Sequence, residues 1–241
     1  MNIAIIGYGK MGKTIEKLAI ERGHKIVMRI SRNNLGEFTI ENLQKLNINV
    51  AIEFTNPHVA FHNITTCFEA GIKVVSGSTA WLKDWDKAIE IMNQNNGSFI
   101  YASNFSVGVN IFFALNAHLA KLMNPHCEYD VRMTEIHHTA KVDAPSGTAV
   151  TLANGIIENL DKKSKWVKEF PPKEDEIAIE SIRQDPAPGT HSINYISAID
   201  EVEIKHIAKS RDGFALGAVL AAEYLLDKKG LFLMKDVLGL Q

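Results

Sequence analysis

Short apolar runs alternate with longer amphipathic segments through the first hundred residues. The runs are rich in Ile and Val, and their length is typical of buried strands. We predict strands at Ile3–Ile6, Ile26–Ile30, Val50–Phe54, Lys73–Ser76 and Phe99–Ala102. We predict helices between them at Lys10–Glu21, Pro57–Ala70 and Asp84–Gln94. Strands that alternate with helices in this way indicate a doubly wound parallel α/β sheet.

The pattern changes after about residue 104, where apolar and polar positions alternate over longer segments. We predict strands at Tyr129–His137, Ile177–Arg183, His191–Ala198 and Glu201–Lys209, and helices at Val109–Met123, Gly147–Leu160 and Phe214–Leu226. Alternation is typical of antiparallel strands with one buried face, so a second α+β domain on a mixed or antiparallel open sheet is expected. Residues 161–176 are charged and contain two prolines, which predicts an exposed connection.

Composition argues against several classes of protein. Hydrophobic residues make up 46% and charged residues 22% of the 241 residues, as in ordinary globular proteins. The formal net charge of -2 offers no field for attracting nucleic acid. No apolar run approaches the roughly 20 residues that span a bilayer, the start of the chain does not read as a signal sequence, and two cysteines are too few for a disulfide framework. We therefore expect a cytoplasmic protein with no nucleic-acid or membrane partner.

A glycine-rich loop joins the first predicted strand to the first predicted helix. It reads Gly7, Tyr8, Gly9, Lys10, Met11 and Gly12, which is the G-x-G-x-x-G spacing of dinucleotide-binding turns. In such turns the glycines permit a tight turn, close approach of a pyrophosphate and close helix packing, and the helix N-terminus attracts the phosphates. A plain glycine-rich turn is the alternative, but the strand before the loop and the helix after it favour a Rossmann-type dinucleotide site.

The end of the second predicted strand bears on the choice of cofactor. NAD-binding proteins commonly carry an acidic residue there for the ribose, whereas this chain has Ser31 and Arg32. A guanidinium can bind a 2′-phosphate, so we expect NADPH to be preferred over NADH. The alternative is that both residues are solvated loop positions.

Polar residues gather at the end of the strand predicted at Tyr129–His137. His137 and His138 are neighbours on a strand, so their side chains point to opposite faces, and we expect no shared metal. Lys141 places a positive charge nearby, which suits a site that holds a carboxylate and donates a proton. Residues 146–148 then begin a helix whose free N–H groups would bind a carboxylate, although helix capping alone also accounts for a Ser and a Thr there.

Residues 135–148 resemble a signature of the 4-hydroxy-tetrahydrodipicolinate reductases, also called dihydrodipicolinate reductases. The signature reads E-x-H-H-x-x-K-x-D-A-P-S-G-T, and further resemblance lies in the glycine-rich loop, in Gly77-Ser78-Thr79, in residues 103–110 and in residues 208–218. The chain departs from the family at Glu53, where an Asp is usual, and at the end of the second strand.

The resemblance implies an NAD(P)H-dependent reductase in the diaminopimelate route to lysine. It implies that His137 exchanges a proton, that Lys141 is a second proton donor, and that His138, Gly147 and Thr148 bind a cyclic dicarboxylate. It also implies that the nicotinamide is lined by Gly77, Ser78, Thr79, Ala102, Ser103, Asn104 and Phe105. Finally it implies a homotetramer, with residues 1–104 and about 213–241 as the dinucleotide domain and 105–212 as the domain for substrate and assembly.

Two other functions would account for part of this sequence. Another Rossmann dehydrogenase acting on amino or keto acids would share the first hundred residues but not the segment from His137 to Thr148. A dinucleotide sensor without catalysis would carry a broken catalytic segment, whereas His137 and Lys141 are both present.

Overall fold

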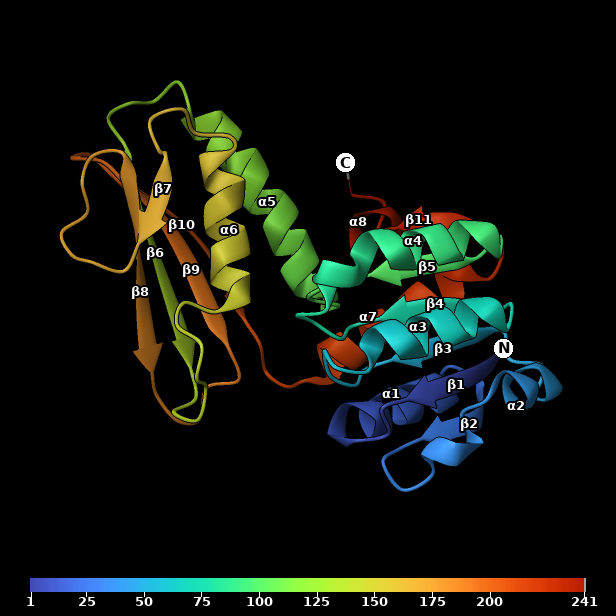
Figure 1. The fold of residues 1–241 in the computed structure, drawn as a ribbon. Coiled ribbons are helices and arrows are strands. Elements are labelled where there is room, and N and C mark those ends of the chain that lie inside the picture. Colours follow the sequence, from blue (N-terminus) through green and yellow to red (C-terminus); the bar gives the residue numbers. More distant parts are fainter. Residues whose placement is uncertain (241) are drawn as a thin grey trace. The chain divides into compact units, whose positions relative to one another are not determined.

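The computed structural model describes residues 1–240, which divide into two compact units (Figure 1). The first unit comprises Met1–Val107 and the chain from Asp212 onward. The second comprises Gly108–Arg211. Each unit has a sheet and a hydrophobic core of its own.

The first unit is built on a six-stranded parallel sheet in the order β11-β5-β4-β3-β1-β2. Its strands are β1 (Asn2–Ile6), β2 (Lys25–Ile30), β3 (Val50–Glu53), β4 (Lys73–Ser76), β5 (Ser98–Tyr101) and β11 (Gly230–Phe232). The five strands predicted from apolar runs are confirmed to within one residue at each end. The order reverses between β1 and β3, and open α/β sheets bind ligands at the carboxyl ends of strands beside such a reversal.

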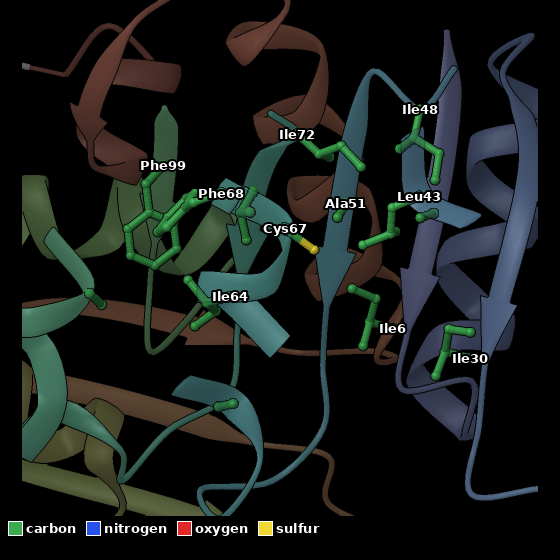
Figure 2. Packing of buried hydrophobic residues seen from close by; sticks show 14 of the residues in the cluster. Ile6, Ile30, Leu43, Ile48, Ala51, Ile64, Cys67, Phe68, Ile72 and Phe99 are labelled. Carbon is green, nitrogen blue, oxygen red and sulfur yellow. The ribbon is translucent and has the colours of Figure 1, made fainter. Parts of the chain in front are cut away.

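Helices cover both faces of this sheet. They are α1 (Lys10–Glu21), α2 (Ile40–Lys45), α3 (Ala60–Glu69), α4 (Trp85–Gln94), α7 (Asp212–Leu225) and α8 (Met234–Val237), with short 3-10 turns at Leu35–Glu37 and Leu82–Asp84. Side chains alternate between faces along a strand. Ile3 and Ile5 of β1 therefore pack with α1 and α7, whereas Ile6 packs in the opposite core with Phe68 of α3 and Phe99 (Figure 2). The predicted doubly wound sheet is confirmed.

The second unit has a five-stranded mixed sheet in the order β10-β9-β6-β8-β7. Its elements are α5 (Val107–Met123), β6 (Asp130–His137), α6 (Gly147–Ile157), β7 (Lys165–Val167), β8 (Glu176–Arg183), β9 (Thr190–Ile196) and β10 (Glu201–Ile207). The pairs β6–β9 and β9–β10 are antiparallel, as predicted. Strands β6 and β8 pair in parallel and not antiparallel, because the chain crosses over through α6 between them, and this makes the sheet mixed, one of the two expected forms.

Residues 161–176 differ from the predicted exposed connection. They contain β7, which pairs in parallel with β8. Lys163 in this segment has a side chain only 1% exposed, and its Nζ lies 2.7 Å from Asp130 Oδ1. The same ammonium donates to the backbone carbonyls of Glu174 and Glu176, at 2.7 and 3.0 Å. A buried lysine with three acceptors ties the segment to the sheet, which its charged composition did not reveal.

Helices α5 and α6 lie side by side along one face of this sheet (Figure 1). Val131 and Met133 of β6 point toward these helices, together with Ile193 and Tyr195 of β9. Side chains of one strand face recur at every second residue, so the next positions on the same face are Glu135 and His137 of β6 and His191 of β9. The helix-covered face therefore changes from apolar to polar at one end.

Candidate active site

The glycine-rich loop closes tightly against the ends of neighbouring strands. Gly7 has a φ of +99°, and a Cβ built on it would lie 2.1 Å from the backbone oxygen of Phe54. A Cβ on Gly12 would lie 2.6 Å from the oxygen of Gly7, so helix α1 packs against the loop at a distance that only glycine allows. Within the described residues, nothing lies within 4 Å of a Cβ built on Gly9. The loop is thus packed on one side and open on the other.

The N-terminus of α1 is available to an anion. Gly9 is its N-cap residue, and no side chain of the described residues caps it. The first turn of α1 carries no acidic residue, so its unpaired N–H groups and positive dipole end are not neutralised locally. Tyr8, also predicted to bind cofactor, donates its hydroxyl to Glu16, which pairs with Arg29.

Phe54 brings several of the predicted cofactor residues together. The ring of Phe105 lies 5.5 Å from the Phe54 ring, centroid to centroid. A Cβ on Gly77 would meet the Phe54 ring at 2.3 Å, and Gly7 meets the Phe54 carbonyl. Ala102 donates its N–H to the oxygen of Ser76 at 3.3 Å. The loops after β1, β3, β4 and β5 therefore converge at the carboxyl edge of the sheet, and Phe54 is a central residue that the sequence analysis did not assign to the site.

Glu53 organises the same edge from within. Its carboxylate is fully buried and accepts hydrogen bonds from Ser76 Oγ at 2.6 Å and Ser78 Oγ at 2.9 Å. Ser78 Oγ also accepts the N–H of Thr55 at 2.8 Å. The Ser78 side chain is thereby engaged inside the protein, whereas Thr79 beside it is exposed. Ser103 is exposed as well, and Asn104 and Phe105 are buried.

Ser31 and Arg32 follow β2 beside the glycine-rich loop. The loop is attached to this strand because Gly7 and Tyr8 both donate to the oxygen of Ile30, at 3.0 and 2.8 Å. Ser31 Oγ donates to Asn34 Oδ1 at 3.0 Å. Arg32 is exposed, and its guanidinium makes no hydrogen bond or ion pair with any residue in the range 1–240. A free guanidinium beside a dinucleotide-type loop is positioned to meet a phosphate.

The second group of predicted residues surrounds Glu135 at the polar end of the other sheet. The Glu135 carboxylate is fully buried and accepts the backbone N–H of Ser146 at 3.1 Å to each oxygen. His137 Nδ1 lies 3.5 Å from Glu135 Oε2, and His191 Nε2 lies 3.7 Å from the same oxygen. The guanidinium of Arg183 lies 3.4 Å from Glu135 Oε1. One carboxylate is therefore surrounded by three groups that carry or can take a positive charge.

Burial and these neighbouring charges shift the pKa values of Glu135, His137 and His191. Burial raises the pKa of Glu135, but hydrogen bonds from Ser146 and Ser181 and the charge of His137 outweigh it, and the pKa lies below its usual value. Burial lowers the pKa of His137, with Lys141 and Arg183 acting in the same direction and Glu135 opposing them. Burial, together with His137, lowers the pKa of His191 to about 4. At neutral pH the carboxylate is charged and His191 is neutral.

A loop connects His137 to α6 and is held by charged groups. Lys141 Nζ donates to both carboxylate oxygens of Asp143, at 2.7 and 2.9 Å. Arg183 donates to the backbone oxygen of Asp143 at 2.6 Å, so it links the loop to Glu135. His138 follows the last residue of β6 and is half-buried. Lys141 and His137 thus belong to one connected cluster.

The N-terminus of α6 lies at this cluster. Ser146 is its N-cap, and Ser146 Oγ accepts the N–H of Ala149 at 3.2 Å. The capping function considered for Ser146 is therefore present. The same Oγ lies 3.2 Å from His191 Nε2. Gly147 is exposed, with nothing among the described residues within 4 Å of a Cβ built there, so its backbone is accessible.

The geometry also bears on metal binding. Donor atoms of Glu135, His137 and His191 lie within 4.8 Å of one another, a group that can hold a metal ion. The prediction that His137 and His138 share no metal says nothing of this group, which joins His137 to residues of two other positions in the sheet. The Glu135 oxygens already accept hydrogen bonds from Ser146 and face Arg183, which a divalent cation would have to displace.

His191 and Arg183 were not predicted as site residues. They stand 56 and 48 residues from Glu135 in the chain, and the strand register places His191 opposite Glu135 and Arg183 opposite His137. A strand register cannot be obtained from the alternation of polar and apolar residues alone, because shifting it by one residue flips every side chain. The only sequence signal was that both residues lie at ends of predicted strands.

The fold and the loop define the class of protein. A doubly wound parallel sheet, with a glycine-rich turn leading to an uncapped helix at the strand-order reversal, is typical of dinucleotide-binding proteins. Comparison with known families is more specific. Residues 1–105 match the family model "Dihydrodipicolinate reductase, N-terminus", and residues 108–238 match "Dihydrodipicolinate reductase, C-terminus". The chain therefore belongs to the dihydrodipicolinate reductase family, which confirms the resemblance.

Individual relatives agree with this membership. The chain is 53% identical to the 4-hydroxy-tetrahydrodipicolinate reductase of Christiangramia forsetii over 241 residues, covering 99% of this chain and 98% of the relative. It is 32% identical to the enzyme of that name from Archaeoglobus fulgidus, covering 99% and 100%. A solved dipicolinate-bound dihydrodipicolinate reductase from Paenisporosarcina sp. TG-14 has the same fold, with a TM-score of 0.77, 22% identity and 97% of each chain covered.

Proposed function

We propose that this protein is a 4-hydroxy-tetrahydrodipicolinate reductase, which transfers a hydride from a reduced nicotinamide dinucleotide to a cyclic unsaturated imine dicarboxylate. The observation that carries the proposal is full-length similarity to enzymes of that name, together with an intact cluster around Glu135, His137 and Lys141. The product is a tetrahydrodipicolinate of the diaminopimelate route to lysine.

The first unit fits a dinucleotide. Its open side at Gly9 and the uncapped start of α1 would receive the pyrophosphate through backbone N–H groups. Arg32, exposed and unpaired among the described residues, would bind a 2′-phosphate, which supports a preference for NADPH over NADH. The backbone after β4 and β5, from Gly77 to Thr79 and from Ala102 to Phe105, would line the nicotinamide. When bound, the cofactor supplies the hydride.

The second unit fits a dicarboxylate. The backbone N–H groups of Gly147 and Thr148 at the start of α6, the ammonium of Lys141 and the imidazole of His138 would bind the two carboxylates. His137 would give the proton that follows the hydride, because an imidazole gains and loses a proton near neutral pH. Lys141, four residues after His137 in the loop that leads to α6, would be the second proton donor. We also propose a cytoplasmic homotetramer, as the family resemblance implies.

The test is a coupled assay with freshly generated 4-hydroxy-tetrahydrodipicolinate, following the loss of reduced-nicotinamide absorbance with NADPH and with NADH. Wild type should oxidise the cofactor only when substrate is present. His137→Gln should lower kcat by about 10²- to 10⁴-fold, as expected for a positioned proton donor. His126→Gln is the matched control, since His126 lies in the same unit with a side chain 55% exposed. Folded protein that binds both cofactors and oxidises neither would overturn the proposal.

A further inference from the structure

A row of polar side chains crosses four strands of the second sheet. His206 of β10 pairs with His191 of β9, His191 pairs with Glu135 of β6, and Glu135 pairs with Ser181 of β8. Residues directly opposite each other on paired strands share a face. Glu135 stands inside this row and is fully buried, so its environment is set by the protein and not by solvent.

The surroundings of Glu135 favour the charged carboxylate. Burying an unpaired carboxylate is very costly, so the groups that face it must compensate. These are the backbone N–H of Ser146, the hydroxyl of Ser181, the guanidinium of Arg183, and the imidazoles of His137 and His191. Lys141, Asp143 and His206 lie further out and act on the two imidazoles through their charge.

The two nitrogens of His137 have different environments. Nδ1 faces Glu135 Oε2 at 3.5 Å, and it is buried with no hydrogen-bond partner in the described part of the chain. Nε2 points toward Gly189, where a Cβ would lie 3.2 Å from it. Gly189 has a φ of +154°, a conformation that favours glycine, and a glycine there leaves no side chain over Nε2.

We propose that Glu135 is a positioning residue that fixes the tautomer of His137, with the proton on Nδ1 directed toward the carboxylate. Nε2 is then the nitrogen that gives and regains the proton at the substrate. The proposal rests on the proposed function of His137, but the tautomer itself does not depend on turnover. A carboxylate behind an imidazole also stabilises the imidazolium that forms when Nε2 takes up a proton.

The direct test is a long-range ¹H–¹⁵N NMR spectrum of the wild-type protein labelled with ¹⁵N-histidine. The His137 signals are assigned by their absence in His137→Gln. At pH 8 we expect Nδ1 protonated and Nε2 bare in wild type. Protonated Nε2 in wild type would overturn the proposal without any substitution at Glu135. Because no substrate is needed, failure here is separable from failure of the reductase assay.

Kinetics of Glu135→Gln supply the second test. Removal of the charge should lower kcat about tenfold to a hundredfold, less than loss of the whole proton donor, while KM stays within about twofold. Glu135 raises the pKa of His137, so in the variant the decline of kcat toward high pH should begin at a lower pH. Glu180→Gln is the matched control, because Glu180 precedes Ser181 on β8, is exposed, and lies on the opposite face.

Two results would contradict a positioning role. One is a Glu135→Gln protein with an unchanged pH profile and a lower melting temperature only, which would make Glu135 a structural residue. The other is stoichiometric binding of Zn²⁺ in calorimetry that His191→Gln abolishes, which would make Glu135 a metal ligand. Unchanged tautomer populations between wild type and Glu135→Gln would support the first of these.

Discussion

The pH dependence of stability should depend measurably on His191. In the folded protein burial lowers its pKa to about 4, whereas an exposed histidine in an unfolded chain titrates near 6.5. Between these two values the unfolded chain binds a proton that the folded chain does not, so folding stability decreases as the pH falls from 6.5 to 4. The difference of about 2.5 pH units, at about 1.4 kcal/mol per unit, corresponds to roughly 3 kcal/mol for this one side chain.

The comparison that isolates this effect is wild type against His191→Gln. Glutamine does not titrate, and its amide group can still form a hydrogen bond with Ser146 Oγ, which lies 3.2 Å from the His191 nitrogen. Urea unfolding is measured at intervals from pH 7.5 to 4.5 for both proteins. The free energy of unfolding of wild type should fall more steeply, by about 2 to 3 kcal/mol over this range.

Glu135 and His137 are present in both proteins but lie against His191, so their titration changes with it; the same measurement on His137→Gln and on the double variant separates the contribution of the pair. His126→Gln, at an exposed histidine of the same unit, should follow the wild-type curve. Parallel curves for wild type and His191→Gln would refute the reasoning, because they would show that His191 takes up its proton without cost in the folded state.

Three further substitutions test other parts of the structure. Arg32→Ala should raise the KM for NADPH by roughly tenfold to a hundredfold, the loss of about 1.5 to 3 kcal/mol of charge-assisted hydrogen bonding, and leave that for NADH unchanged in the same assay. Gly217→Ala should lower the free energy of unfolding by more than about 3 kcal/mol, because the added Cβ would lie 1.7 Å from a backbone oxygen, whereas Gly155→Ala in α6 should raise it by up to about 1 kcal/mol. Lys163→Ala should cost roughly 2 to 3 kcal/mol in urea unfolding because buried carbonyl oxygens lose their donor, while exposed Lys168→Ala should cost almost nothing. Equal changes in the free energy of unfolding for Gly217→Ala and Gly155→Ala, or for Lys163→Ala and Lys168→Ala, would contradict these explanations.

The fold was largely predictable because its strongest determinant is local. The apolar run Lys73–Ser76 and the helical period of Lys10–Glu21 are each contained in a few consecutive residues, and the structure reproduces both elements. Helices α2 and α8 and strands β7 and β11 were missed. Strands β7 and β11 have only three residues each, and their pairing with strands elsewhere in the chain determines them. The parallel direction of β6 and β8 was missed for a related reason, since alternation reports which face is buried but not which way a strand runs.

The candidate site was predictable only where it is contiguous in the chain. The segment around His137 and Lys141 and the loop from Gly7 to Gly12 each form one local structure, so a motif describes them. Phe54 and His191 take their place through packing and strand register, which depend on residues far apart in the chain. Motif reading therefore identified the groups proposed to act on ligands, and the structure was needed to find the residues that hold those groups in place.

The return of the chain to the first sheet has a consequence for biosynthesis. Strand β11 pairs with β5 at the sheet edge, and α7 covers the face formed by Ile3, Ile5 and Val50, yet both are made more than one hundred residues after β5. During translation, the apolar face that α7 covers and the edge of β5 that β11 pairs with therefore stay exposed while the second unit is synthesised. We expect chaperones to bind residues 1–107 at this stage. We also expect fragments that end before Asp212 to aggregate when expressed.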